Sequence, residues 1–230
     1  MIGIIGSTED NTDTIINHIE TDLYDLIKNV EPYHENEGDI QDNTFILMDI
    51  SVDGYTSVES KELTYSIATN AYNQGDSIMD VGCGLGDLYS FMNTKFSNIN
   101  KLYSGIDFNK NKIELSKTKY KDINTECMDF NDLTETSDYI FAINIFNDMI
   151  YNDMGSYLID SIEKLYSITN KCLVFNILNE KTQLDADNDI TNVYSLNLIS
   201  DMLKSYDFFI HRTEYIYGES MIYIYKPASI

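Results

Sequence analysis

The chain has 230 residues, 43% of them hydrophobic, and its 15 Lys plus Arg against 38 Asp plus Glu give a formal net charge of −23. This size suits one folded domain with a small appendage, and the acidic balance argues against nucleic acid and anionic membranes, which are bound through basic patches. The three cysteines lack C-x-x-C spacing. No signal-peptide pattern and no apolar run of about 18 residues occur, so the sequence predicts a cytoplasmic protein without a membrane span.

Residues 1–6 and 45–50 are short apolar runs that predict strands, and residues 8–28 repeat apolar side chains at helical spacing. We therefore expect an N-terminal appendage over residues 1–54, either a small βαβ unit or a cap. The core is expected over residues 55–230, and it begins with a predicted helix at 57–71.

Residues 77–91 read SIMDVGCGLGDLYSF, an apolar strand followed by Gly82, Gly84 and Gly86 and then by a helical pattern over 87–96. A strand, a glycine-rich turn and a helix in this order build a nucleotide-type site. Glycines there permit positive φ angles and a close approach of the backbone to a ligand. The dinucleotide fingerprint G-x-G-x-x-G would place its third glycine at position 87, where this chain has aspartate.

The rest of the core alternates between strand and helix patterns. Strands are predicted at 101–108, 124–130, 138–146 and 171–178, helices at 110–120, 154–166 and 195–206, and a terminal hairpin of strands 207–217 and 221–226 around Gly218. Asp107 follows the glycine turn by the interval of a ribose-binding acid. The alternative for Asp107 is a helix cap, although Asn109 is the better cap.

The sequence DVGCGLG resembles motif I, (D/E)-x-G-x-G-x-G, of class I S-adenosylmethionine-dependent methyltransferases. This resemblance implies an α/β fold with a Rossmann-like seven-stranded sheet, whose last strand enters antiparallel between the fifth and sixth. It also implies S-adenosyl-L-methionine as cofactor. Three phrases, GCGLGDLYSFM, YIFAINIFND and CLVFNIL with HRTEYIYGESMIYIYK, are similar to a bacterial and phage group of small methyltransferases whose acceptor is undefined. Close members of that group read A-S-G-I-F-N where this chain has A-I-N-I-F-N.

The resemblance also supplies the cofactor-binding candidates. Asp107 would bind the ribose, and Asp129 with Phe130 would bind the adenine, the alternative for Asp129 being a turn-forming role. The full set of candidates is Tyr65, Asp80, Gly82, Cys83, Gly84, Gly86, Asp107, Phe108, Asp129, Phe130 and Asn144.

Candidates for acceptor binding or proton removal lie after the strand predicted at 138–146, because ligands of parallel sheets bind beyond the carboxyl ends of the strands. They are Asn144, Asn147, Asp148 and, from the hairpin, His211. Amino-methylating family members carry (D/N)-P-P-(Y/F) where this chain reads N-I-F-N, which argues against methylation of adenine or cytosine. No metal site is predicted: the three histidines lack metal spacing, and residues 185–189 imitate a calcium loop without its glycine and glutamate.

Three hypotheses follow. The leading one is a methyltransferase that acts on a small molecule or an exposed protein or glycan group. The second is a nucleotide-dependent oxidoreductase, which would require the missing glycine at position 87. The third is a non-catalytic cofactor-binding or interaction module, which the intact glycine motif with Asp107 and Asp129 disfavours.

Overall fold

A computed structural model of the protein describes residues 58–147, 153–182, 192–213 and 215–227. Its seven strands form one sheet in the order β3-β2-β1-β4-β5-β7-β6. The first five run parallel, and β7 is antiparallel to both β5 and β6, as the resemblance implied. The strands are β1 (Ile78–Val81), β2 (Tyr103–Asp107), β3 (Thr125–Cys127), β4 (Ser137–Ala142), β5 (Thr169–Leu178), β6 (Phe209–Arg212) and β7 (Glu219–Tyr225).

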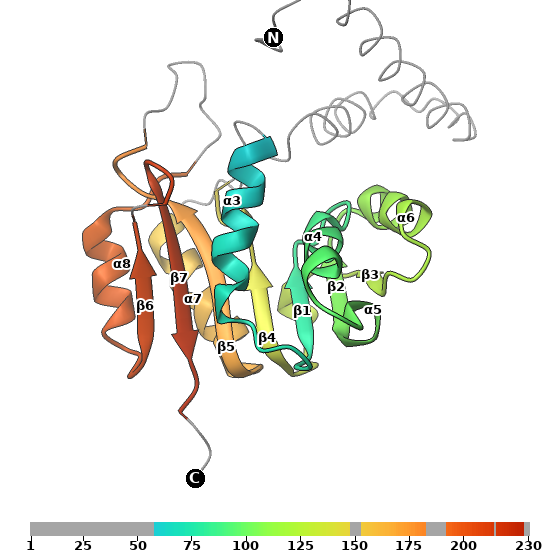
Figure 1. Cartoon of the computed structure of the whole chain (residues 1–230). Helices are drawn as coiled ribbons and strands as arrows, with labels where there is room; N and C mark the ends of the chain where they lie inside the picture. The colour runs from blue at the N-terminus through green and yellow to red at the C-terminus, as the bar shows by residue number, and fades with distance from the viewer. Residues whose placement is uncertain (1–57, 148–152, 183–191, 214, 228–230) are drawn as a thin grey trace, which may run out of the picture. The chain divides into compact units, whose positions relative to one another are not determined.

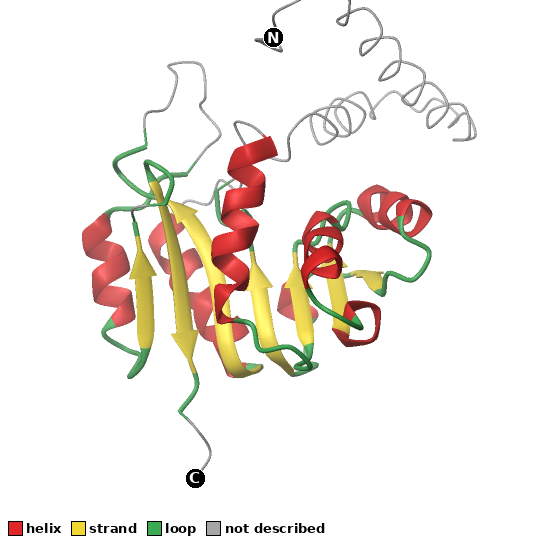
Figure 2. Ribbon diagram, viewed as in Figure 1, coloured by secondary structure: helices red, strands yellow, loops and turns green. Residues whose placement is uncertain are grey.

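Helices cover both faces of this sheet (Figures 1 and 2). One face packs against α3 and α4 through a cluster that includes Tyr65, Met92 and Phe141, and the other packs against α7 and α8 through a cluster that includes Leu158 and Ile199. The helices are α3 (Val58–Ala68), α4 (Asp87–Lys95), α5 (Ile99–Leu102), α6 (Lys110–Lys119), α7 (Met154–Ser167) and α8 (Leu196–Leu203), with 3-10 turns η1 (Thr69–Ala71) and η2 (Phe130–Asp132).

Each predicted element of the core has a counterpart, but several boundaries differ. The strand predicted at 124–130 spans only Thr125–Cys127, and the strand predicted at 207–217 spans only Phe209–Arg212. Two other differences have clear reasons. The strand expected over 101–108 begins only at Tyr103, because α5 takes up the residues before it. The apolar run 138–146 leaves the sheet at Ala142, because Asn144 adopts a left-handed conformation with φ 60°. Continuous hydrophobicity marks burial, and residues 143, 146 and 147 are indeed buried without being in the strand.

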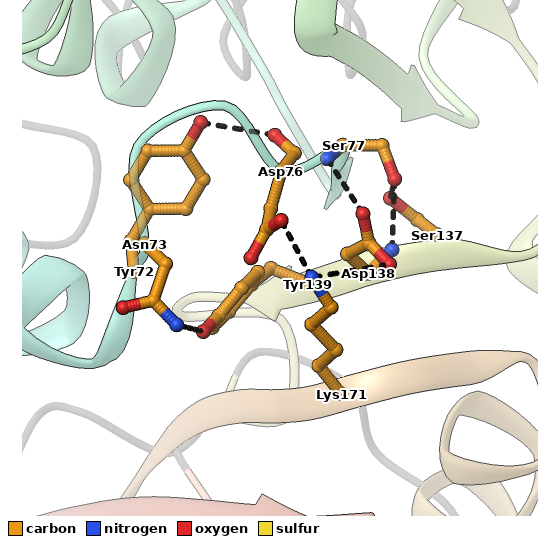
Figure 3. A network of polar contacts seen from close by, with 8 residues as sticks. All are labelled: Tyr72, Asn73, Asp76, Ser77, Ser137, Asp138, Tyr139 and Lys171. Atoms are coloured by element: carbon orange, nitrogen blue, oxygen red, sulfur yellow. Dashed lines mark hydrogen bonds and ion pairs between the residues drawn. The ribbon is translucent and has the colours of Figure 1, made fainter. Parts of the chain in front are cut away.

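The amino ends of β1, β4 and β5 are joined by a polar network (Figure 3). Lys171 approaches Asp76 at 2.5 Å and Asp138 at 3.9 Å, and Asp138 accepts a hydrogen bond from the Ser77 backbone at 3.1 Å. The Asn73 amide donates to the Tyr139 hydroxyl at 2.9 Å. The network links the amino ends of these three strands. It therefore lies at the opposite end of β1 from the glycine turn.

In the described parts of the chain, no helix is long and apolar enough to cross a membrane. The appendage predicted at 1–54, the candidate Asp148 and the calcium-like stretch at 185–189 lie outside the described residues.

Candidate functional site

The glycine turn lies at the carboxyl ends of β1 and β2. The backbone N–H groups of Gly82 and Cys83 both donate to the Ile106 carbonyl, at 2.8 and 2.9 Å, and Gly86 donates to the Cys83 carbonyl at 2.9 Å. Gly82, Gly84 and Gly86 have φ angles of 76°, 50° and 81°, a region that glycine enters at little cost. The turn is therefore fixed to β2 by its own backbone, and Gly86 ends it as the N-cap of α4.

The three glycines differ in what surrounds them. A Cβ on Gly82 would lie 2.2 Å from Cγ2 of Ile145, and one on Gly86 would lie 2.6 Å from Cδ1 of Ile123. A Cβ on Gly84 would meet no atom within 4 Å in the part of the chain that the structure describes. Gly82 and Gly86 thus serve protein packing, whereas Gly84 is the point at which the backbone of the turn faces open space.

Asp107, at the end of β2, lies directly beside this open position. One of its carboxylate oxygens accepts from the Gly84 N–H at 3.0 Å and the other from the Asn109 N–H at 2.8 Å. Asn109 itself caps α6, as expected, by accepting from the N–H groups of Asn111 and Lys112. A carboxylate has about four lone-pair sites, so it can accept more hydrogen bonds than these two backbone bonds. Phe108, the next residue, is 67% exposed beside it.

Asp80 lies in β1, two residues before Gly82, and is buried, 3% exposed. Burial raises its pKa to about 7, while a hydrogen bond from the Tyr103 hydroxyl at 2.5 Å acts in the opposite direction. Cys83, in the turn itself, is also buried, and burial raises the pKa of its thiol far above the usual range. Asp80 and Cys83, both candidates from the sequence, therefore form a desolvated layer beneath the turn.

The remaining cofactor candidates differ in how far their side chains are buried. Asp129 is exposed and accepts from the backbone and side-chain N–H of Asn131, each at 2.9 Å, as the N-cap of η2. Phe130 is partly buried against the core cluster that includes Ile140. Tyr65 is buried in α3 with its ring centroid 5.6 Å from that of Phe91, so its ring is a packing element of the helix.

The segment after β4 also contacts the glycine turn. Its Ile145 side chain fills the space beside Gly82, whereas Asp107 lies beside Gly84. Asn144, the residue before Ile145, is held in the left-handed conformation by a reciprocal pair of hydrogen bonds with Asn176 of β5. The Asn144 N–H donates to Asn176 Oδ1 at 2.7 Å, and Asn176 Nδ2 donates to Asn144 Oδ1 at 2.6 Å. Residues in such uncommon backbone conformations concentrate at functional sites, where the surroundings enforce them.

The same pair leads to a carboxylate that sequence reasoning missed. Asn176 Nδ2 lies 3.5 Å from Glu219 Oε2 at the start of β7, and the Tyr215 hydroxyl donates to that oxygen at 2.7 Å. Burial raises the pKa of Glu219, and the two hydrogen bonds partly offset it. No motif marks Glu219, because only the antiparallel entry of β7 brings its first residue to the carboxyl edge of the sheet.

The other catalytic candidates have structural contacts. Asn147 is buried, and its Oδ1 accepts from the Leu178 N–H at 2.9 Å, which ties the segment after β4 to the end of β5. His211 lies in β6, and its Nε2 is 3.0 Å from the hydroxyl of buried Ser220. Burial lowers the pKa of His211, so its ring is held neutral near neutral pH. His211 therefore contacts Ser220, which follows Glu219 in the chain. Asn144, in contrast, precedes Ile145, the residue that contacts the glycine turn at Gly82.

Comparison with known proteins gives one family match. Residues 72–204, more than half of the chain, match a family described as a methyltransferase domain. No curated protein sequence matches significantly.

Solved structures share the fold at low sequence identity. The plantazolicin methyltransferase BamL, in complex with a triazolic desmethylPZN analog and SAH, has a TM-score of 0.59 and 14% identity over 93% of this chain and 98% of its own. Magnesium protoporphyrin IX methyltransferase from Synechocystis PCC 6803, with bound SAM, has a TM-score of 0.53 and 12% identity over 96% and 100%. The cyclase SpnF has a TM-score of 0.57 and 11% identity over 74% and 82%. At these identities the likeness concerns the fold.

Proposed function

Because the chain belongs to the methyltransferase domain family, we propose that it transfers a methyl group from S-adenosylmethionine to a small molecule or an exposed protein or glycan group. The observation that carries this proposal is the open Gly84 position beside the Asp107 carboxylate. The net charge of −23 supports an acceptor other than nucleic acid. Two structural neighbours are named as methyltransferases of magnesium protoporphyrin IX and of plantazolicin, and neither name refers to a nucleic acid.

The described residues fit this cofactor. Gly84 leaves a space that any side chain would fill, and the buried Asp107 carboxylate below it suits a pair of ribose hydroxyls, which it would accept in charge-assisted hydrogen bonds. Asp80 suits the ammonium of the methionine part. When bound, the cofactor supplies an activated methyl group on a sulfonium centre. We assign Asp129 and Phe130 to the adenine end, because they follow β3 next to β2 in the sheet.

We assign acceptor binding to the region near the segment after β4, on the other side of the glycine turn from Asp107. Asn144 and Glu219 are joined there through Asn176 of β5, so that the Asn144 amide, just after β4, and the Glu219 carboxylate, at the start of β7, are held in place by the sheet. Alignment of two reactants by fixed groups supplies roughly 7–11 kcal/mol of catalysis when the geometry is right. A carboxylate with a raised pKa also suits the removal of a proton from an amine or hydroxyl acceptor.

The first test is calorimetric titration of S-adenosylmethionine, S-adenosylhomocysteine and NADH into the protein. We expect micromolar dissociation constants for the two sulfur compounds and no heat of binding with NADH. Binding of NADH alone would replace the proposal with an oxidoreductase function.

The acceptor side is tested by formation of S-adenosylhomocysteine with a panel of amines, hydroxyl compounds, peptides and glycans. For any acceptor that is methylated, Glu219→Gln should lower kcat/KM at least tenfold, about 1.4 kcal/mol. The dissociation constant for S-adenosylmethionine should stay unchanged. Glu180→Gln is the matched control, since Glu180 is an exposed glutamate just beyond β5. Equal turnover by Glu219→Gln and the control would remove Glu219 from the acceptor site.

A second candidate function is cofactor binding without methyl transfer. It is favoured by the likeness to SpnF, a protein of this fold that is named a cyclase. Tight binding of S-adenosylmethionine together with no turnover on any member of the acceptor panel would support it.

A further inference from the structure

Under the glycine turn, the buried Tyr103 at the start of β2 reaches past Gly105 to the carboxyl group of Asp80 in the neighbouring strand β1. Tyr103 is 2% exposed, and its hydroxyl lies 2.5 Å from Asp80 Oδ2. The ring passes over Gly105: a Cβ at that position would lie 3.0 Å from the Tyr103 hydroxyl oxygen and 2.9 Å from Cβ of Cys83. Gly105 therefore clears the path by which Tyr103 contacts Asp80.

The direction of this hydrogen bond follows from the two acidities. Burial and the charge of Asp80 hold the pKa of Tyr103 well above its usual range, so the phenol keeps its proton and donates it. That donation stabilises the ionised form of Asp80 and opposes the effect of burial on its pKa. Among the residues that the structure describes, no lysine, arginine or histidine forms an ion pair with Asp80.

A buried carboxylate without a cationic partner is costly, and it is stabilised by a ligand that brings the positive charge. Other acidic groups around Asp80 raise that cost further. The charged and titratable groups that act on the pair are Asp107 from β2, Asp87 from α4, Cys83 from the turn and Tyr65 from α3. Asp87 is itself paired with Lys61 at 2.7 Å and with Lys119 at 2.8 Å, so the nearby lysine charges are directed to Asp87 rather than to Asp80.

We propose that Tyr103 is a positioning residue for the cofactor: its hydroxyl donates to the Asp80 carboxyl group and orients it beneath the glycine turn to receive the ammonium group of S-adenosylmethionine. Tyr103 acts through Asp80 and does not itself contact the ligand. This inference rests on the proposed function.

The test is calorimetric titration of S-adenosylmethionine into the wild type and Tyr103→Phe across pH. We expect the dissociation constant of Tyr103→Phe to be about tenfold larger at neutral pH, since a hydrogen bond to a charged group is lost. The pH below which affinity declines should move upward in this variant, because Asp80 without its donor is protonated more easily. The matched control is Tyr139→Phe, an equally buried tyrosine that loses one hydrogen bond at the opposite edge of the sheet.

A double-mutant cycle separates positioning from general packing. In an Asp80→Asn background, the added Tyr103→Phe change should alter the dissociation constant by less than about twofold, because the carboxylate through which it acts is gone. An equal loss in both backgrounds, or an unchanged pH profile of Tyr103→Phe, overturns the inference while leaving the proposed function intact. If the wild type binds neither S-adenosylmethionine nor S-adenosylhomocysteine, the proposed function falls and the inference with it.

A measurement on the wild type covers the case in which Tyr103→Phe does not fold. The carboxyl carbon of Asp80 is followed by NMR during pH titration, with its resonance assigned through Asp80→Asn. Added S-adenosylmethionine should keep Asp80 ionised to lower pH, whereas an unchanged Asp80 titration would refute the inference.

Discussion

Replacing Gly84 with valine should abolish cofactor binding while leaving the protein folded. A Cβ at this position meets no atom of the described residues within 4 Å, so the change creates no clash with them. The φ of 50° would cost an L-residue about 1–2 kcal/mol. For a domain of this size that cost corresponds to a fall in Tm of roughly 2–8 °C. The turn has no freedom to retreat from the new side chain, because Gly82 and Cys83 are both bonded to the Ile106 carbonyl.

The valine side chain would therefore stand where the ligand must approach the backbone. We expect the affinity for S-adenosylmethionine and S-adenosylhomocysteine to fall at least 100-fold, about 2.8 kcal/mol, in calorimetric titration. Gly75→Val is the control, because Gly75 also has a positive φ, 104°, and open space around it, but lies before β1 at the other end of the strand. It should lose stability and keep affinity. A folded Gly84→Val protein with affinity within about twofold of the wild type would refute our placement of the cofactor.

Three further outcomes are expected. Gly82→Ala should lower the free energy of unfolding by about 1–3 kcal/mol through the clash with Ile145 Cγ2, and the second change Ile145→Ala, which removes that atom, should restore part of the loss in urea denaturation. Asp107→Ala should weaken S-adenosylmethionine binding by about 2–4 kcal/mol, since charged hydrogen bonds to the ribose are lost; a calorimetric loss below about 0.5 kcal/mol would restrict Asp107 to its backbone contacts. Burial lowers the pKa of folded His211, so the unfolded chain binds more protons and stability should fall as the pH drops below about 6.5. His211→Gln should flatten that decline in urea denaturation measured at successive pH values, and an unchanged slope would show that other groups produce it.

The sequence by itself determined the order of elements and the place of the turn. Alternation of apolar strands with helical patterns depends on burial of each segment, which is a local property of the chain, so β1, α4 and β5 were found close to their true bounds. The glycine motif is equally local, because a turn with positive φ angles requires glycine whatever lies around it. The same holds for Asn109, whose capping role depends on the residues that follow it.

Only the tertiary structure decided which glycine faces open space and which polar groups meet around it. Tyr103 and Asp80 are 23 residues apart in neighbouring strands, and Asn144, just after β4, is 32 residues from Asn176 of β5, so both contacts depend on the order of the sheet. Glu219 arrives beside Asn176 because β7 enters antiparallel, which places its amino end where the other strands have their carboxyl ends. Sequence patterns record burial and turn chemistry along the chain, whereas a site at the edge of a sheet depends on contacts between segments, and these are fixed only when the strands are paired.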